Sequence, residues 1–514
     1  MDRFSDLFGN SGATVMLVVT VTAVYVYYTT LDFGYFKKQG IPGPRPWPIF
    51  GNMLAAFRKG RIASDMDDVR RYGKIVGTFT GRKPTLLIAD PELAKAVMVK
   101  EFSNFVNRPM FGSGDKVFDN TLMALRDGKW KFVRQSLAPS FSAAKLKQMT
   151  KRVNDAAKQF TDNLLAEGRQ QKSFEMRQFT GDFTMDVIAS TAFGLQVNSQ
   201  KERDNPFVVH AWQAFQAIRI SNPVLLSMIF CPILLPFFNF FGKTMIPQSS
   251  TRFFASVVRE ALKQRSAGDD RSVDLLQLMI NAHKEEGSKM TPDAEDESYE
   301  KCREMGLTED LMISQAVIFF LSGYDTTASM LAFLAYNLAL NPDCQDRLIR
   351  EIDDIVKDSD TIDHDMISQM TYLDMCVQET LRMYPPIIRM VRIAKNDIVL
   401  NDIVIRKDTR IAIPIYAIHH DPEVWPDPDK FDPERFTPEE KAKRHPFSHI
   451  PFGMGPRNCI GMRLALHESM IAMSHALRRA KFVVCEQTQI PLKFSRRALL
   501  AAEKGIWLKL ELRE

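Results

Sequence analysis

The sequence predicts a mainly α protein with a minor β part, preceded by one N-terminal transmembrane helix. Three stretches carry this prediction: residues 13–31 are apolar and uncharged, residues 74–90 alternate as two short strands, and residues 92–390 are mostly helical in pattern. Because no internal repeat is evident, we expect the part after the first helix to form one α-dominated unit.

The composition is that of an ordinary globular protein and excludes some functions. The 514 residues are 45% hydrophobic and 25% charged, with a formal net charge of +5. This small charge, without a dense block of lysine and arginine, argues against wholesale nucleic-acid binding. The six cysteines include no C-x-x-C pair, which leaves a zinc knuckle or a thioredoxin-type site without support and indicates reduced cytosolic thiols.

The apolar run at residues 13–31 is long enough to cross a bilayer. At ~1.5 Å per residue it reaches about 28 Å, and Lys37 and Lys38 follow it. The positive-inside rule then places the rest of the chain in the cytosol. The alternative is a cleaved signal peptide, but its basic n-region and small-residue cleavage site are not evident. We therefore predict a membrane anchor at residues 1–36.

Four prolines, at positions 42, 44, 46 and 48, follow the anchor. Each proline fixes φ and blocks helix formation, so residues 37–52 are predicted to form a stiff linker. Residues 53–514 are then expected to form a single catalytic domain.

Two further apolar runs resemble membrane spans. Residues 223–241 contain three prolines, which break a continuous helix too often for a simple span. We interpret this run as a surface patch that dips into the membrane, or as an entrance for lipophilic ligands. Residues 316–340 hold one charge, Asp325. Since an isolated carboxylate is costly at mid-bilayer, this run predicts the long central helix of a large core.

Local signals place several other elements. Residues 74–90 predict two strands joined by a turn, and Asp90–Pro91 and Asn341–Pro342 each predict the start of a helix. Residues 284–305 are polar and charged, so we expect an exposed, mobile loop there.

The stretch PFGMGPRNCIG, residues 451–461, surrounds Cys459 with glycines at 453, 455 and 461. Glycine permits positive φ and a close approach of the backbone. The following residues, 462–478, predict an amphipathic helix, whose N-terminal amides and dipole would stabilise a thiolate at Cys459. A lone thiolate without neighbouring ligands suits the axial position of a haem iron. The alternative is a glycine-rich turn around a buried, inert cysteine.

Together, five motifs resemble those of the cytochrome P-450 family and occur in its chain order. They are WKFVR with Trp130 and Arg134, SGYDTT at 322–327, ETLR with Glu379 and Arg382, FDPERF with Arg435, and the cysteine loop from Phe452 to Gly461. The segments 36–52, 410–436 and 451–466 are further similar to the family-3 branch of animal microsomal enzymes. The resemblance covers essentially the whole chain. It implies the P-450 fold, a large helical domain with a long central helix and a small β-rich region.

The resemblance also implies roles for individual residues. Cys459 would be the axial thiolate ligand of haem b (iron protoporphyrin IX), a ligand that favours O–O cleavage. Thr326 would hold a hydrogen-bonded water and Asp325 would relay protons. The alternative for Thr326 is a hydrogen bond back to the helix carbonyl four residues earlier. Ser322 stands where the family more often has alanine or glycine.

Propionate groups buried beside a porphyrin need cationic, fork-shaped partners. The implied cofactor-binding residues are Arg108, Trp130, Arg134, Arg392, Phe452, Arg457 and Cys459. For Arg108 and Arg392 the alternative is an ordinary surface arginine. The trio of Glu379, Arg382 and Arg435 is expected to form a buried structural ion network.

The implied function is that of a single-pass haem-thiolate monooxygenase of the endoplasmic reticulum membrane, with its catalytic domain in the cytosol. It would oxidise small lipophilic substrates such as xenobiotics, steroids and fatty acids, using dioxygen. The chain has no dinucleotide- or flavin-binding motif, so electrons from NADPH would come through NADPH-cytochrome P-450 reductase, with cytochrome b5 as a further candidate partner. A candidate docking surface is basic: Lys129, Lys131, Lys145, Lys147, Arg463 and residues 441–445.

Two other functions stay open at this point. A haem-thiolate isomerase that rearranges a lipid peroxide needs no reductase, but such relatives tend to lose the acid–alcohol pair, which is intact here as Asp325 and Thr326. A multi-span membrane carrier would use residues 223–241 and 316–340 as spans. The prolines of the first run and Asp325 in the second argue against it.

Overall fold

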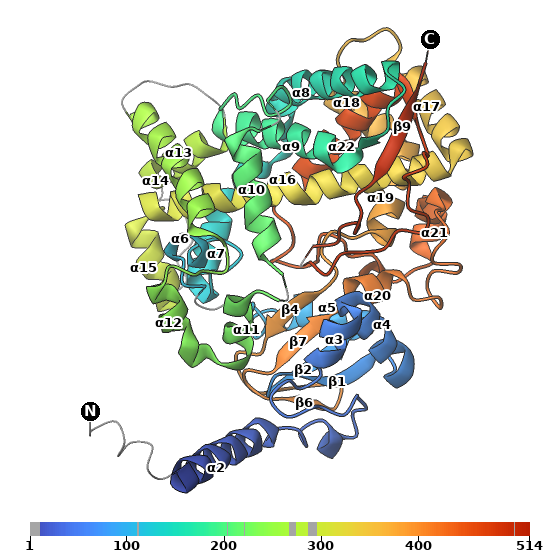
Figure 1. Cartoon of the computed structure of the whole chain (residues 1–514). Helices are drawn as coiled ribbons and strands as arrows, with labels where there is room; N and C mark the ends of the chain where they lie inside the picture. Colours follow the sequence, from blue (N-terminus) through green and yellow to red (C-terminus); the bar gives the residue numbers. More distant parts are fainter. Residues whose placement is uncertain are drawn as a thin grey trace.

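The computed structural model describes residues 11–109, 113–202, 204–219, 221–266, 274–285, 296–497 and 499–513. Helices make up most of it, and the four-stranded sheet lies in a smaller lobe with the short helices α3, α4, α5 and α20 (Figure 1). The prediction of a mainly α protein with a minor β part is confirmed.

The larger, helical part is built from elements that run through the middle of the chain. They are α6 (Lys116–Asp119), α7 (Asp127–Leu137), α8 (Ala143–Arg169), α9 (Met176–Phe193), α10 (Pro206–Ala217), α11 (Pro223–Phe230), α12 (Leu235–Phe240), α13 (Gln248–Ser266), α14 (Leu275–Glu285), α15 (Glu297–Met305), α16 (Glu309–Leu340), α17 (Pro342–Val356), α18 (His364–Gln369), α19 (Thr371–Met383), α21 (Pro438–Ala442) and α22 (Met462–Leu477).

The remaining helices lie near the N-terminus or around the sheet. They are α2 (Ser11–Thr30), α3 (Met53–Lys59), α4 (Arg61–Tyr72), α5 (Pro91–Lys95) and α20 (Ile415–His419). The strands are β1 (Ile75–Thr80), β2 (Lys83–Ile88), β3 (Phe174–Glu175), β4 (Met390–Ile393), β5 (Ile398–Leu400), β6 (Ile403–Ile405), β7 (Arg410–Ile413), β8 (Ala480–Val483) and β9 (Trp507–Leu512).

The main sheet has the order β1-β2-β7-β4, with β2 and β7 parallel and the other two pairs antiparallel. The predicted pair of strands within residues 74–90 is confirmed as β1 and β2. The predicted helix start at Asp90 is also confirmed, because its carboxylate accepts a hydrogen bond from the Leu93 amide at 2.8 Å and Pro91 is the first residue of α5. Small residues let the proline-rich linker pack on β1: the Gly77 amide donates to the carbonyl oxygen of Pro42 at 2.8 Å.

Helix α16 runs through the centre of the helical part (Figure 1). Among the described residues it is the helix long and apolar enough to cross a membrane, but 83% of that apolar window is buried inside the protein. This burial supports the prediction of a core helix. In α2 the described apolar stretch, Thr14–Thr30, is shorter than such a span.

Two large clusters of buried side chains meet along α16. The first packs the C-terminal half of α16, including Phe333, against α8, α19 and α22. The second packs its N-terminal half against α7, α9 and α13, where the rings of Phe193 and Phe320 stack with centroids 4.1 Å apart. Since Ile460 of the cysteine loop packs on the second cluster, this core fixes the loop relative to α16.

The structure corrects two expectations. Of the loop predicted at residues 284–305, residues 284–285 end α14 and residues 297–305 form α15, because the Asp296 carboxylate caps that helix and Tyr299 and Cys302 are buried. Residues 286–295 lie outside the described residues. Helix α22 begins where predicted but is not amphipathic. It is buried on every side from His467 to Leu477, because it packs against both α8 and α16.

Candidate active site

The cysteine loop is closed by its own backbone. The amide of Cys459 donates to the carbonyl oxygen of Phe452 at 2.8 Å. Gly453 and Gly455 have φ of 70° and 75°, in the left-handed region that favours glycine. A Cβ on Gly455 would lie 2.1 Å from the carbonyl oxygen of Met98, so no larger residue fits there. Phe452 itself is partly buried at the start of the loop, against the first core cluster.

Opposing influences act on the Cys459 thiol. The side chain is accessible, yet it lies deep within the protein, and this burial raises the pKa of the thiol. The amides of Gly461 and Met462, at the N-terminus of α22, and the guanidinium groups of Arg134 and Arg108 act in the opposite direction. Gly461 has a φ of −89°, so the expectation of positive φ at that position is wrong. A Cβ there would meet no protein atom within 4 Å.

Four arginines lie near this thiol, of which Arg392 and Arg457 are buried and Arg108 and Arg134 are partly buried. Those predicted as propionate partners are Arg108, Arg134, Arg392 and Arg457. Burial lowers the pKa of all four, and repulsion by neighbouring arginines adds to this for three of them: the pKa falls to about 8 for Arg457, about 9 for Arg392 and about 10 for Arg108. Within the described part of the chain, none of them forms an ion pair with a carboxylate. Asp127 opposes the shift of Arg457 from beyond ion-pair distance. A group of cations placed in this way is costly unless an anion completes it.

Arg457 shows how the group is held. Its guanidinium donates to the carbonyl oxygens of Leu125 at 2.6 Å and Met123 at 3.3 Å, and it lies 4.8 Å from the ring centroid of Trp130. The Nε atoms of Arg457 and Arg392 are buried and have no hydrogen-bond partner among the described residues. These orphaned donors, beside an accessible thiol, fit the propionates and the iron of a haem.

Arg134 and Arg108 connect the arginine group to the cysteine loop. Arg134 donates to the carbonyl oxygen of Asn458 at 3.0 Å and to its Oδ1 at 2.8 Å. Arg108 reaches the carbonyl oxygen of Arg457 at 3.4 Å. The structure therefore brings together the sequence-predicted residues that flank Cys459, including Arg108 and Arg392, which are not ordinary surface arginines.

On α16, Asp325 is not a free carboxylate. It is 6% exposed and forms an ion pair with Arg177 of α9, whose Nε also donates to the Ser329 hydroxyl at 3.2 Å. Sequence reasoning missed Arg177, because no motif marks it. The available signal was the central charge of α16, which needs a partner when buried.

Thr326 forms the hydrogen bond within its own helix that was the alternative to holding a water. Its hydroxyl donates to the carbonyl oxygen of Ser322 at 2.7 Å. The hydroxyl oxygen keeps lone pairs that can accept a hydrogen bond from water. Ser322, Gly323 and Thr326 are accessible in a stretch of α16 that is otherwise buried. The face that they share is therefore the open face of this helix.

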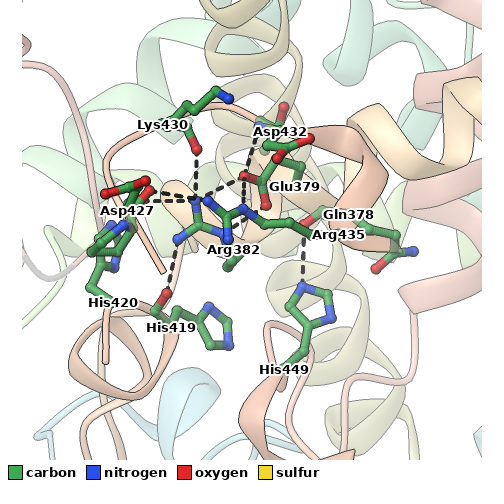
Figure 2. A network of polar contacts seen from close by, with 12 residues as sticks. Gln378, Glu379, Arg382, His419, His420, Asp427, Lys430, Asp432, Arg435 and His449 are labelled. Carbon is green, nitrogen blue, oxygen red and sulfur yellow. Dashed lines mark hydrogen bonds and ion pairs between the residues drawn. The ribbon is translucent and has the colours of Figure 1, made fainter. Parts of the chain in front are cut away.

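The ion network behind the cysteine loop is present (Figure 2). Arg382 donates from Nε and Nη2 to the two carboxylate oxygens of Glu379, at 2.6 and 2.9 Å, and from Nη1 to the carbonyl oxygen of His419 at 2.9 Å. Arg435 Nε lies 3.4 Å from the Glu379 carboxylate. Burial raises the pKa of Glu379, and the bond from Arg382 opposes this rise. All three predicted members thus meet.

Glu468 is a buried acid that sequence reasoning missed. It lies on α22, is 3% exposed, and has its pKa raised to about 8 by burial, with an opposing hydrogen bond to Thr327 of α16. A single glutamate in a helical pattern usually marks the solvent face, so nothing local distinguishes it.

Comparison with known proteins identifies the family. The family described as "Cytochrome P450" matches residues 41–510. Cytochrome P450 3A29 of Sus scrofa is 38% identical over 98% of this chain and 97% of its own, and Cytochrome P450 3A41 of Mus musculus is 37% identical over 99% and 98%. Cytochrome P450 3A56 of Fundulus heteroclitus is 37% identical over 96% of both chains. The chain therefore belongs to the cytochrome P450 family of haem-thiolate proteins and is a monooxygenase of the oxidoreductase class.

Proposed function

We propose that this protein is a membrane-bound monooxygenase that oxidises lipophilic substrates, including xenobiotics, steroids and fatty acids. It uses dioxygen and electrons from NADPH, which a separate reductase delivers. The observation that carries this proposal is the accessible Cys459 thiol beside a group of arginines that, in the described part of the chain, form no ion pair with a carboxylate. The similarity to proteins named as 3A members supports the substrate classes.

The side chains around the site have distinct tasks. Cys459 would hold the haem iron, and the propionates would lie among Arg108, Arg134, Arg392 and Arg457, with Trp130 and Phe452 packing nearby. When bound, the haem supplies the oxygen-activating chemistry. The loop keeps the sulfur at the N-terminus of α22, where amide groups favour the thiolate.

Proton delivery falls to the acid–alcohol pair on α16. Thr326 is placed to hold a water with the lone pairs of its hydroxyl, on the accessible face of the helix. Asp325 points to α9 and is paired with Arg177, so a proton relay through it requires that the carboxylate exchange this partner for water. We propose that opening of the Arg177–Asp325 pair accompanies proton transfer.

We assign residues 1–36 to a single-pass anchor in the endoplasmic reticulum membrane, residues 37–52 to the linker and residues 53–514 to a cytosolic haem domain. Most side chains of α2 from Val15 to Val24 are exposed and apolar, as are Phe237 and Phe240 of α12. Helix α2 also contacts the end of α11, since the Tyr25 hydroxyl donates to the carbonyl oxygen of Phe230 at 3.2 Å. Together they form an apolar surface suited to a bilayer.

Electron transfer requires a partner at the thiolate side. The basic face predicted from the sequence is one candidate for NADPH-cytochrome P-450 reductase, with cytochrome b5 as another partner. Arg463 is exposed next to the cysteine loop, whereas Lys147 and Lys441 lie 3.7 and 3.8 Å from Asp365 and Asp374. An acidic partner would compete with these weak surface pairs.

The two other functions have less support. An isomerase would not need the acid–alcohol pair, and both residues are present on α16. A multi-span carrier would need residues 223–241 as one helix, but they form α11, a short 3-10 turn and α12. Its second span, α16, is buried inside the protein.

The test is spectroscopic and catalytic. The purified chain should show the red-shifted Soret band of a thiolate-ligated ferrous–carbon monoxide complex, and Cys459→Ser should lose it. Cys485→Ser, at another free and partly buried cysteine, is the matched control and should keep the band. Reductase-dependent NADPH consumption with formation of an oxygenated product then separates a monooxygenase from an isomerase. A colourless protein from haem-replete cells, or full turnover by Cys459→Ser, would refute the proposal.

A further inference from the structure

A cavity of about 680 Å³ is lined by residues of the linker, α3, α11 and the C-terminal loop, together with Arg219 and Ser221, which precede α11. One wall is apolar. The rings of Phe50 and Phe57 lie 5.5 and 6.3 Å from the ring of Phe230, centroid to centroid, and Leu226 extends this wall. The volume is within the range of about 300–1,000 Å³ that is usual for small-molecule sites.

The other wall of this cavity carries arginines. Arg219 and Arg497 pair through an isolated antiparallel bridge, which places their side chains at neighbouring positions. Like charges directly opposite each other across such a bridge are destabilising. Burial, Arg177 and Arg219 together lower the pKa of Arg497. In the described ranges, neither Arg219 nor Arg497 forms an ion pair with a carboxylate. Arg219 donates a hydrogen bond to the side-chain oxygen of Gln216, a neutral group that leaves the two positive charges uncompensated.

A third arginine in the cavity has a structural task. Arg496 donates to the carbonyl oxygens of Phe57 at 2.9 Å and Arg58 at 2.8 Å, which ties the C-terminal loop to α3. This tie holds the loop, and with it Arg497, against the apolar wall. Arg219 and Arg497 are therefore the cations that the cavity offers to a ligand.

We propose that this cavity binds an amphiphile with one anionic group, held between Arg219 and Arg497, and an apolar body that lies against Phe230 and the neighbouring rings. An anion there would relieve the repulsion between the two guanidinium groups, and hydrogen bonds between charged groups are the strong ones. A neutral lipophile would fill the apolar wall but leave the cations uncompensated.

The surroundings indicate where such a ligand comes from. Because Phe230 accepts a hydrogen bond from Tyr25 of α2, the cavity adjoins the segment that we assign to the membrane. The same chemistry is offered by a free long-chain acid and by an anionic phospholipid. The inference rests on the proposed function only for this membrane setting, since binding requires neither electrons nor turnover.

The experiment is equilibrium dialysis of the full chain, loaded with haem, in a neutral detergent. The probes are radiolabelled dodecanoate and 1-dodecanol, which share one chain length and differ in charge. We expect dodecanoate to bind about tenfold more tightly than dodecanol, the value of roughly one charged hydrogen bond. Raising the salt from about 50 mM to about 500 mM should reduce this preference, because screening weakens ion pairing.

The variant Arg219→Gln/Arg497→Gln should lose the preference for dodecanoate and keep its affinity for dodecanol. Arg479→Gln, at an exposed arginine outside the cavity, is the matched control and should behave as wild type. In a second arm, phosphatidylcholine vesicles with phosphatidylglycerol either displace dodecanoate, which identifies an anionic phospholipid as the ligand, or do not, which identifies the free acid.

Equal affinities of wild type for the two probes, or an unchanged preference in the double variant, would overturn the inference. The ferrous–carbon monoxide spectrum of each sample reports the haem site independently. A normal spectrum without charge preference defeats the cavity proposal alone, whereas an absent thiolate band in wild type defeats the proposed function.

Discussion

Arg177 at the start of α9 forms an ion pair with Asp325 at the middle of α16, and both side chains are largely buried. The only charge in the apolar stretch 316–340 is thus neutralised by a residue far from it in the sequence. The pair joins the helix that carries Thr326 to the neighbouring helix α9. It also places a cation between the acid of the proposed relay and the arginines of the cavity, because Arg177 acts on Arg497.

Replacement of Arg177 by glutamine should destabilise the fold by roughly 3–5 kcal/mol, because it leaves the Asp325 carboxylate buried without its partner. Asp325→Asn should cost less, and the double variant should be more stable than Arg177→Gln alone. Urea unfolding of the four proteins forms a double-mutant cycle, and simple additivity of the two effects would show that the pair is not coupled.

Arg382→Lys should be far more damaging than its conserved charge suggests. The guanidinium makes directed bonds to Glu379 and to the carbonyl oxygen of His419, which one ammonium group cannot reproduce. We expect a loss of about 3–5 kcal/mol and reduced haem content, measured by unfolding and by absorbance. The control is Arg347→Lys at the exposed pair with Glu434, where about 0–1 kcal/mol is expected; a loss of similar size there would contradict this explanation.

Acid should destabilise the protein through buried histidines. Burial lowers the pKa of His420 and His449 to about 3, against 6.5 for an exposed imidazole. Below pH 6.5 the unfolded chain therefore binds protons that the folded chain does not, and stability falls as the pH drops toward 3. At pH 5 each histidine contributes about 2 kcal/mol of this loss. His420→Asn/His449→Asn should flatten the stability curve between pH 6.5 and 5; an unchanged slope would contradict the assignment.

Glu468 should act in the opposite sense. Its pKa is raised to about 8 in the folded state, against 4.5 for an exposed glutamate. Below pH 4.5 the acid is protonated in both the folded and the unfolded chain, and the free energy of unfolding is at its highest. As the pH rises from 4.5 through 8, the unfolded chain releases this proton first, so the free energy of unfolding falls. Glu468→Gln cannot ionise, so it should be more stable than wild type by about 4 kcal/mol near pH 8. Melting curves at pH 5 and pH 8 measure this difference, and an equal shift at both values would show that ionisation is not the cause.

The predictions that succeeded depend on short spacing or on whole-element composition. Glu379 and Arg382 are three residues apart on one helix, so their contact follows from helix geometry. Gly455 is demanded by its positive φ and by the nearby Met98 carbonyl, and the glycine pattern indicated such a turn. The apolar composition of α16 is also that of a membrane span. Because a carboxylate such as Asp325 is costly at mid-bilayer, the sequence predicted a core helix instead.

The features that were missed depend on long-range packing. Arg177 and Asp325 are 148 positions apart, and no local pattern relates them. Glu468 is buried because α22 lies between α8 and α16, which composition does not show. Helix α15 was predicted as a loop because most of its residues are charged or polar. Its buried residues, Tyr299 and Cys302, are too few to give a helical pattern of apolar positions. In each case the partner element supplies the information.

The contact between Arg496 and α3 has a consequence for how this enzyme tolerates mutation. The guanidinium donates hydrogen bonds to the main-chain carbonyl oxygens of Phe57 and Arg58 and not to the side chain of either residue. A substitution at position 57 can therefore change the apolar wall of the cavity while the hydrogen bonds that hold the C-terminal loop on α3 are kept. Ligand preference in this part of the molecule is free to diverge without loss of the architecture that supports it.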